Sequence, residues 1–363
     1  MKAVIAEINL KALVHNALAI RAMVPDSKIV AVVKANAYGH GLFAVAETLD
    51  PYVDALAVAR IDEALSLRER GIQKPIILLE GFFEPADLPL IEKHHLLTAV
   101  HDMEQVEWIE KSDVKGPLQC WMKIDIGMHR LGASPEDVAT LKARLEACPK
   151  VAKPLGLISH LSVADTPSEF NYNREQIDYF LEVAKDFTGD LCLANSAGIL
   201  FWPKSHTAWV RPGIILYGVS PFEDRVGADF ELEPVMTLKS SLIAIRRLKK
   251  GAKVGYGAAW TAPEDTVIGV VATGYGDGYP RMAPNGTPVW VKGRIVPSVG
   301  HVCMDMMFVD LGLNATEKVG DEVILWGKEV PVEKVAALCG TIPYELLCRV
   351  MPRVDTRYVK DGA

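Results

Sequence analysis

Short apolar segments alternate with amphipathic ones between about residue 28 and residue 218 of the chain. The apolar segments are rich in β-branched residues and are short, as buried strands are. There are eight of them: KIVAVVKA, ALAVAR, PIILLEG, LLTAV, QCWMKIDI, LGLISHLS, LCLANSA and WVRPGIILYG. The segments between them repeat apolar residues at helical spacing, as in RIDEALSLRERG and SPEDVATLKARLEA. Ser134 and Pro135, followed by acids, predict that a helix starts at that point.

This alternation of strands and helices predicts an α/β fold with a parallel sheet. Eight strands separated by helices favour a (β/α)8 TIM barrel, which we place at residues 10–227. The alternative is an open, doubly wound sheet. The sequence lacks the GxGxxG turn that is typical of the dinucleotide-binding form of that sheet, so the barrel is favoured.

The pattern changes after residue 227, where strands are punctuated by Gly, Pro and Asn. These strands are LKSSLIAIRRL, TVIGVVATGYG, GTPVWVKGRIVPSVG and DEVILWG. They predict a β-rich C-terminal domain over residues 228–363, closed by the short helix VEKVAALCG and a charged final strand. The opening segment AVIAEINL predicts a lone strand within residues 1–9 that associates with this domain.

Composition restricts the partners. The chain has 363 residues, of which 50% are hydrophobic, so it can bury one large core or two smaller ones. Its net charge is -7 with Lys and Glu interspersed, so we expect neither nucleic acid nor an anionic membrane as a partner. The N-terminus turns polar too early for a signal peptide, and no apolar run reaches membrane-spanning length. The six cysteines form no CxxC pair, which indicates a reducing, cytoplasmic setting, and we expect no metal ion.

Polar side chains follow the predicted strands. In a barrel, reactive groups lie at the C-terminal ends of the strands, where the βα loops open to solvent. Lys34 ends the first strand in AVVKANAYGHG. By itself it could be an ordinary lysine that reaches solvent. Other strand ends carry Lys123, Arg130, His160, Asn195, Ser196 and Arg211. A partly desolvated lysine with cations nearby has a lowered pKa, which makes Lys34 a candidate for Schiff-base chemistry.

Seven segments of the chain, in order and at compatible distances, resemble those of the bacterial alanine racemases. They are AVVKANAYGHG, WMKIDIGMHRLG, ISHLSVAD, RPGIILYG, VGYGAAW, GYGDGYPR and HVCMDM. That family consists of pyridoxal phosphate enzymes with a barrel and a β domain. The resemblance spans nearly the whole chain. It implies an isomerase that interconverts L-alanine and D-alanine, supplies D-alanine for peptidoglycan, and acts as a cytoplasmic homodimer with shared active sites.

The resemblance also implies two bases. Lys34 would hold pyridoxal 5'-phosphate as a Schiff base and act as a base once the substrate amine displaces it. Tyr256, in VGYGAAW, would act on the opposite face of the substrate Cα, from the other subunit. A tyrosine pKa near 10 makes a poor base without help, so Arg211 and His160 are expected to assist it. Arg211 would face the pyridine nitrogen. Because a guanidinium only donates, that nitrogen stays unprotonated, which suits a racemase that suppresses transamination.

The phosphate ligands come from the same resemblance. They would be Tyr38, Ser196, Tyr344 and the backbone amides of Gly213 and Ile214. Asn195 and His160 are also among the expected cofactor-binding residues, and His160 would pack by the cofactor ring. Judged on local sequence alone, a plain helix cap explains Ser196 almost as well, since SAGILF could start a helix.

Substrate contacts and the entrance complete the expected site. Arg130 would bind the substrate carboxylate and the phenolic oxygen of the cofactor, because its planar fork suits oxygen acceptors. Lys123 would be carbamylated, which turns a cation into an anion that orients Arg130. The Met304 amide would meet the substrate carboxylate. The entrance would be narrowed by Asp165, Tyr275, Arg281, Cys303 and Asp305. For Met304 and Cys303 alone, packing within a strand is the default interpretation.

Three other functions remain open. An amino-acid decarboxylase of the same architecture is disfavoured by Arg211, because those enzymes generally place a carboxylate at the pyridine nitrogen. A non-catalytic pyridoxal phosphate-binding barrel protein is disfavoured by the second domain with VGYGAAW. An aldolase that works through a barrel lysine would be excluded by a cofactor absorption band.

Overall fold

The computed structural model describes residues 4–360, which form two compact units. The barrel unit comprises residues 16–37 and 41–216. The β unit comprises the described residues up to His15, the short segment Tyr38–His40, and the chain from Tyr217 on. The barrel unit is therefore shorter at both ends than the expected 10–227, and it excludes one segment that follows its first strand.

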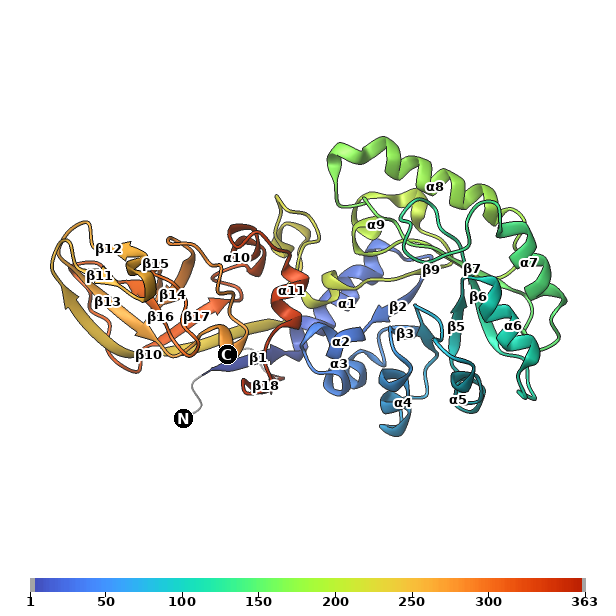
Figure 1. The fold of residues 1–363 in the computed structure, drawn as a ribbon, viewed down its shortest axis with the longest axis horizontal. Coiled ribbons are helices and arrows are strands. Elements are labelled where there is room, and N and C mark those ends of the chain that lie inside the picture. Colours follow the sequence, from blue (N-terminus) through green and yellow to red (C-terminus); the bar gives the residue numbers. More distant parts are fainter. Residues whose placement is uncertain (1–3, 361–363) are drawn as a thin grey trace. The chain divides into compact units, whose positions relative to one another are not determined.

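Eight parallel strands close the barrel, which confirms the predicted fold class (Figure 1). These strands are β2 (Lys28–Val32), β3 (Ala55–Val58), β4 (Ile76–Leu78), β5 (Leu97–Val100), β6 (Gln119–Lys123), β7 (Gly156–Ile158), β8 (Leu191–Cys192) and β9 (Trp209–Val210). Strand β2 pairs with β3 on one side and with β9 on the other, and this pairing closes the ring. All residues of β3, β4 and β7 are buried, which explains their continuous apolar runs.

Helices alternate with these strands, and Figure 1 shows α4 to α8 on the outer side of the barrel strands. The helices are α1 (Leu10–Met23), α2 (Lys34–Tyr38), α3 (Leu42–Leu49), α4 (Ile61–Glu69), α5 (Leu88–Lys93), α6 (Met103–Lys111), α7 (Val138–Ala147), α8 (Phe170–Ala184) and α9 (Ser196–Phe201). The predicted helix start at Ser134 was wrong, because α7 begins at Val138. The Ser134 carbonyl accepts from the amides of Asp137 and Val138, so a turn precedes the helix.

The β unit is built on a mostly antiparallel sheet of eight strands. In sheet order they are β13 (Thr266–Val271), β16 (Met307–Asp310), β15 (Arg294–Val299), β14 (Pro288–Val291), β17 (Glu322–Trp326), β10 (Met236–Leu248), β1 (Ile5–Asn9) and β18 (Asp355–Val359). A short pair, β11 (Lys253–Val254) and β12 (Trp260–Thr261), and the helices α10 (Val332–Leu338) and α11 (Pro343–Cys348) complete the unit.

The N-terminal strand β1 lies inside this sheet. It pairs antiparallel with β10 and parallel with β18, the C-terminal strand. Within the same unit, β10 also pairs with β13 and β17. A small core of Val254 (β11), Ile268 (β13) and Val299 (β15) packs against Leu248, Trp260 and Phe308. Between residues 4 and 360, no helix combines the length and apolar character needed to cross a membrane.

Candidate active site

The turn that begins at Lys34 is left-handed. Ala35, Asn36, Ala37 and Tyr38 all have φ between 53° and 54°. L-residues in this region lose about 1–2 kcal/mol each, so surrounding bonds must hold the turn. The Ala37 amide donates to the Val33 carbonyl at 2.8 Å, and the Asn36 side chain accepts from the Leu42 amide at 2.8 Å. Lys34 is thereby placed, half-buried, just beyond the C-terminal end of β2.

Lys123 is a buried cation at the C-terminal end of β6. Its Nζ donates to the Leu79 carbonyl at 2.8 Å, and only 7% of the residue is exposed. Burial, and then the nearby charges of Arg211, Arg130 and Lys34, lower the pKa of Lys123 to about 8, against a smaller opposing effect of a carboxylate. Four cationic side chains of the barrel unit are therefore close enough for their charges to interact, namely Lys123, Arg211, Arg130 and Lys34.

Arg211, which follows β9, is tied to the barrel backbone. Its Nη1 donates to the Cys192 carbonyl at 3.0 Å and lies 2.9 Å from the Cys192 Sγ. Its Nη2 donates to the carbonyls of Ser159, at 2.5 Å, and Leu193, at 3.2 Å. With 4% of the residue exposed, these bonds fix the guanidinium plane.

His160 is the neighbour of Arg211, and its Nδ1 lies 3.4 Å from Arg211 Nη2. A guanidinium cannot accept, so Nδ1 must be the acceptor and Nε2 carries the proton of the neutral ring. Burial, and then the charge of Arg211 followed by those of three further cations, hold the pKa of His160 well below its usual range. His160 is therefore a neutral imidazole at pH 7.

Ser196 and Asn195 lie together after β8, at the start of α9. Asn195, not Ser196, caps the helix: its Oδ1 accepts from the Gly198 amide at 2.9 Å. The helix-cap interpretation of Ser196 was therefore wrong. The buried Ser196 hydroxyl accepts from the Gly213 amide at 2.9 Å, and its own proton is left to donate. Ile214 is buried beside Gly213, at the start of the 3-10 turn Ile214–Tyr217.

Arg130 is exposed on the loop after β6. Asp125 orders this loop, because its Oδ1 accepts from the amides of Gly127, Met128 and His129 at 2.9–3.1 Å. Asp165 lies half-buried on the loop after β7, and the Thr166 hydroxyl is 3.5 Å from its carboxylate. The pKa shifts of Lys123 and His160 thus show that the barrel unit places five of the predicted residues near one another: Lys34, Lys123, Arg130, His160 and Arg211.

Tyr38 and Tyr344 are neighbours in the β unit, with ring centroids 5.9 Å apart. Burial, and then the nearby Cys348 thiol, raise the pKa of Tyr38, so its hydroxyl stays protonated and able to donate. Tyr344 is half-buried on α11. The second unit also carries Tyr256, which stands on the turn Tyr256–Ala258 between two glycines of positive φ, with 72% of its surface exposed.

Four of the five residues predicted for the entrance lie in the β unit, namely Tyr275, Arg281, Cys303 and Asp305, whereas Asp165 belongs to the barrel unit. The Tyr275 amide donates to the Cys303 carbonyl at 3.0 Å, and the Gly276 amide donates to the Met304 carbonyl at 2.8 Å. Burial raises the pKa of Cys303, and the charge of Arg281 acts against that shift. The Asp305 carboxylate accepts from Arg353 at 2.8 Å.

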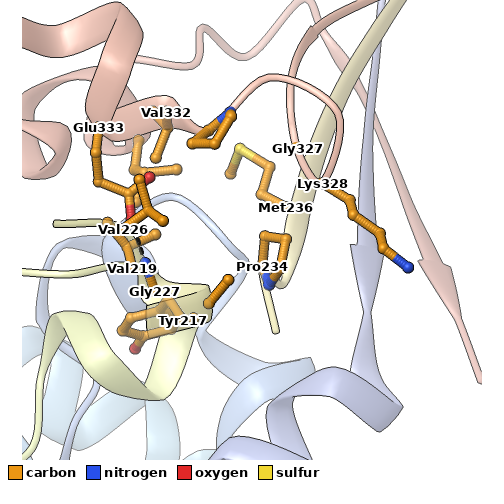
Figure 2. Close-up of a pocket in the computed structure, with 14 residues that line it drawn as sticks. Tyr217, Val219, Val226, Gly227, Pro234, Met236, Gly327, Lys328, Val332 and Glu333 are labelled. Carbon is orange, nitrogen blue, oxygen red and sulfur yellow. Dashed lines mark hydrogen bonds between the residues drawn. The ribbon is translucent and has the colours of Figure 1, made fainter. Parts of the chain in front are cut away.

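Figure 2 shows a pocket of the β unit that is separate from these predicted residues. None of the predicted site residues lines it. Glu333, which lines this pocket, accepts at Oε1 from the Gly227 amide at 2.9 Å. The same oxygen accepts from the Ser220 amide at 2.9 Å, so the buried carboxylate holds the two ends of the loop between Ser220 and Gly227 together.

Three contacts at the site were missed by the sequence reasoning. Cys192 contacts Arg211, Asp125 orders the Arg130 loop, and Glu63 accepts from the Ala35 amide beside Lys34. Only Asp125 had a local signal, because an Asp two residues before a Gly often accepts from the turn that follows it.

A closed parallel barrel with a lysine and further cations after its strands, together with an antiparallel β domain, defines a class of barrel enzymes with a lysine-centred site. The family model described as alanine racemase, N-terminal domain, matches residues 8–221, and the model described as alanine racemase, C-terminal domain, matches residues 235–358. The chain belongs to the alanine racemase family.

Relatives match over full length. The alanine racemase of Aeromonas hydrophila is 55% identical over 359 residues, which cover 99% of this chain and 100% of that protein. The alanine racemase of Vibrio parahaemolyticus is 54% identical over 360 residues, with 99% and 100% covered. Among solved structures, the biosynthetic alanine racemase of Pseudomonas aeruginosa superposes with a TM-score of 0.95 at 42% identity, covering 99% of this chain and 100% of that one.

Proposed function

We propose that this protein is a pyridoxal phosphate-dependent alanine racemase that supplies D-alanine for peptidoglycan. The observation that carries the proposal is full-length membership of the alanine racemase family in a chain that keeps Lys34 at a barrel strand end. Relatives that are named as racemases disfavour the decarboxylase and the non-catalytic binding protein.

The donor set of the barrel unit fits pyridoxal phosphate. Arg211, Arg130 and Lys34 are three cations that lie near one another there, so the group that binds should be anionic. The Ser196 hydroxyl would donate to its phosphate, with the amides of Gly213 and Ile214 beside it. Tyr38 and Tyr344 are the further phosphate donors we propose. Arg211 Nε takes no part in the bonds that fix the guanidinium, so it is the donor left for a ring nitrogen.

Lys34 and Tyr256 would be the two catalytic residues. When bound, pyridoxal phosphate supplies a conjugated electron sink that makes the Cα proton of an attached amino acid removable near neutral pH. Racemisation needs a proton-accepting group on one face of Cα and a proton-donating group on the other. The Lys34 amine would serve one face and the Tyr256 hydroxyl the other, and reversing their roles gives the reverse reaction.

Arg211 and His160 would tune the site as a unit. Arg211 keeps its charge, so a ring nitrogen that faces it stays an unprotonated acceptor. The proton on His160 Nε2 is then available to the Tyr256 hydroxyl, whose basic form needs a donor nearby. Asn195 holds the α9 cap beside Ser196 and would support the cofactor-binding segment.

Arg130 and Lys123 would handle the substrate carboxylate. The Arg130 fork suits the two oxygens of a carboxylate. We propose that Lys123 is carbamylated, because an anion at this position would orient Arg130, whereas an ammonium repels it. The Met304 amide is a second donor for that carboxylate. Asp165, Tyr275, Arg281, Cys303 and Asp305 would narrow the entrance.

We also propose that the active protein is a homodimer in which each site takes Tyr256 and Met304 from the partner. Three large side chains of the β unit are highly exposed in the single chain, which supports their being covered by a partner subunit: Tyr256 is 72% exposed, Met282 73% and Met304 54%. Covering these side chains with a partner would be favourable, because it would remove apolar surface from water. The free cysteines of the chain support the reducing cytoplasm as its location.

Incubation with L-alanine in deuterated water tests the function. The protein loaded with pyridoxal phosphate should incorporate deuterium at Cα and drive the optical rotation to zero. A Lys34→Ala variant should do neither. Deuterium exchange with retained rotation, or no exchange by loaded wild-type protein, would contradict the proposal.

A further inference from the structure

Glu63, on the first turn of α4, bonds to the backbone beside Lys34. Its Oε1 accepts from the Ala35 amide at 2.6 Å. Its Oε2 accepts from the amides of Ala59 and Arg60 at 3.1 Å and 3.2 Å. One carboxylate therefore joins the chain after β2 to the chain after β3.

The Glu63 carboxylate takes the place of a backbone hydrogen bond between the extensions of β2 and β3. Strands β2 and β3 are parallel neighbours, and the last bond between them runs from the Val33 amide to the Ala57 carbonyl at 2.9 Å. If the parallel ladder continued, the next bond would run from the Ala35 amide to the carbonyl of residue 59. The chain turns into α4 there instead, and Glu63 supplies the acceptor.

We propose that Glu63 is a positioning residue that fixes the direction of the Lys34 side chain. The inference rests on the proposed role of Lys34. The amides of Val33 and Ala35, on either side of Lys34, are both held to the β3 side. The bond to Glu63 also holds the first residue of the left-handed turn, Ala35. None of the four positive-φ residues of this turn is a glycine, so the turn needs such bonds to persist. Losing that bond frees the turn to relax toward right-handed conformations and moves the lysine amine away from the reacting carbon.

Glu63→Gln is the near-isosteric test, because an amide has one acceptor oxygen in place of two. That oxygen should stay with the two donors, the amides of Ala59 and Arg60, so that the –NH2 faces the Ala35 amide and this bond is lost. Glu63→Asp is the second variant, since it keeps the charge but is shorter by one methylene. Glu69→Gln, at the exposed end of the same helix, is the matched control. All are compared as pyridoxal phosphate-loaded protein, after their unfolding transitions show that each variant is folded.

Two readouts separate positioning from simple support of the fold. Hydrogen exchange of the peptide around Ala35 should quicken by about 10- to 100-fold in Glu63→Gln, as expected for a lost charge-assisted bond. The kcat for alanine should fall at least about tenfold with KM little changed, because the amine is misplaced in a bound complex. Glu63→Asp should lie between, and Glu69→Gln should match wild type.

The outcomes are distinct. Unchanged exchange at Ala35 in Glu63→Gln overturns the inference, and so does faster exchange with unchanged kcat. If wild-type loaded protein does not racemise alanine, the proposed function fails instead, whatever the exchange data show.

Discussion

Lys123 should take up carbon dioxide far more readily than an ordinary lysine. Carbamylation requires the neutral amine, which attacks the carbon of CO2, forms an N–C bond and releases a proton to water. Burial and neighbouring cations lower the pKa of Lys123 from 10.5 to about 8. At pH 7 these values correspond to a neutral fraction of about one-tenth instead of about one in 3,000, a gain of about 300-fold.

The rate of carbamate formation at Lys123 should also depend on pH in a way that reports its lowered pKa. Below its folded-state pKa the amine is protonated and cannot react. At a fixed CO2 pressure, the initial rate of carbamate formation should therefore rise with pH and level off above about pH 8. An exposed lysine would continue to rise toward pH 10.5.

Carbon-13 NMR of protein equilibrated with labelled bicarbonate measures this directly. We expect one slowly exchanging carbamate signal that disappears in Lys123→Ala and persists in Lys111→Ala, a change at an exposed lysine. A signal insensitive to Lys123→Ala, or a rate that levels off only near pH 10.5, would refute the electrostatic reasoning.

Two further predictions concern assembly and packing. Mixed Lys34→Ala and Tyr256→Phe chains, each nearly inactive alone, should recover about half the activity of a wild-type dimer per heterodimer, because one of its two sites is then intact; no recovery after demonstrated subunit exchange would reject shared sites. Gly156→Ala should lower the free energy of unfolding by about 1–3 kcal/mol, because a Cβ there would lie 2.3 Å from the Trp121 ring. Gly116→Ala, where a Cβ meets only ordinary contacts, is the control in urea unfolding, and equal losses in the two variants would contradict the packing argument.

The barrel was predictable because its strands are buried on both faces. Such strands appear in sequence as short apolar runs, and each of the eight predicted runs contains a barrel strand. Helix starts were less predictable. At Ser134 the cap signal belongs to a turn, and α7 starts only after that turn. In the β unit, β16 was not distinguished because it begins at Met307, directly after the motif HVCMDM that was assigned to the site.

The candidate site residues could be named from the family resemblance. The backbone conformations and hydrogen bonds that hold them in place could not. Ala and Tyr favour right-handed conformations, so nothing local predicts the left-handed turn after Lys34. An acid in the first turn of a helix is ordinarily a local capping residue. The bond from Ala35 to Glu63 depends on how two neighbouring strands end, which is a tertiary feature.

Borohydride trapping tests the central claim most directly, namely that Lys34 holds the cofactor. Protein loaded with pyridoxal phosphate should absorb in the visible, lose that band on reduction, and yield one labelled peptide after digestion. The account predicts that this peptide contains Lys34 and that Lys34→Ala protein yields no label. A label on Lys123, or on no lysine of the wild-type protein, would contradict it.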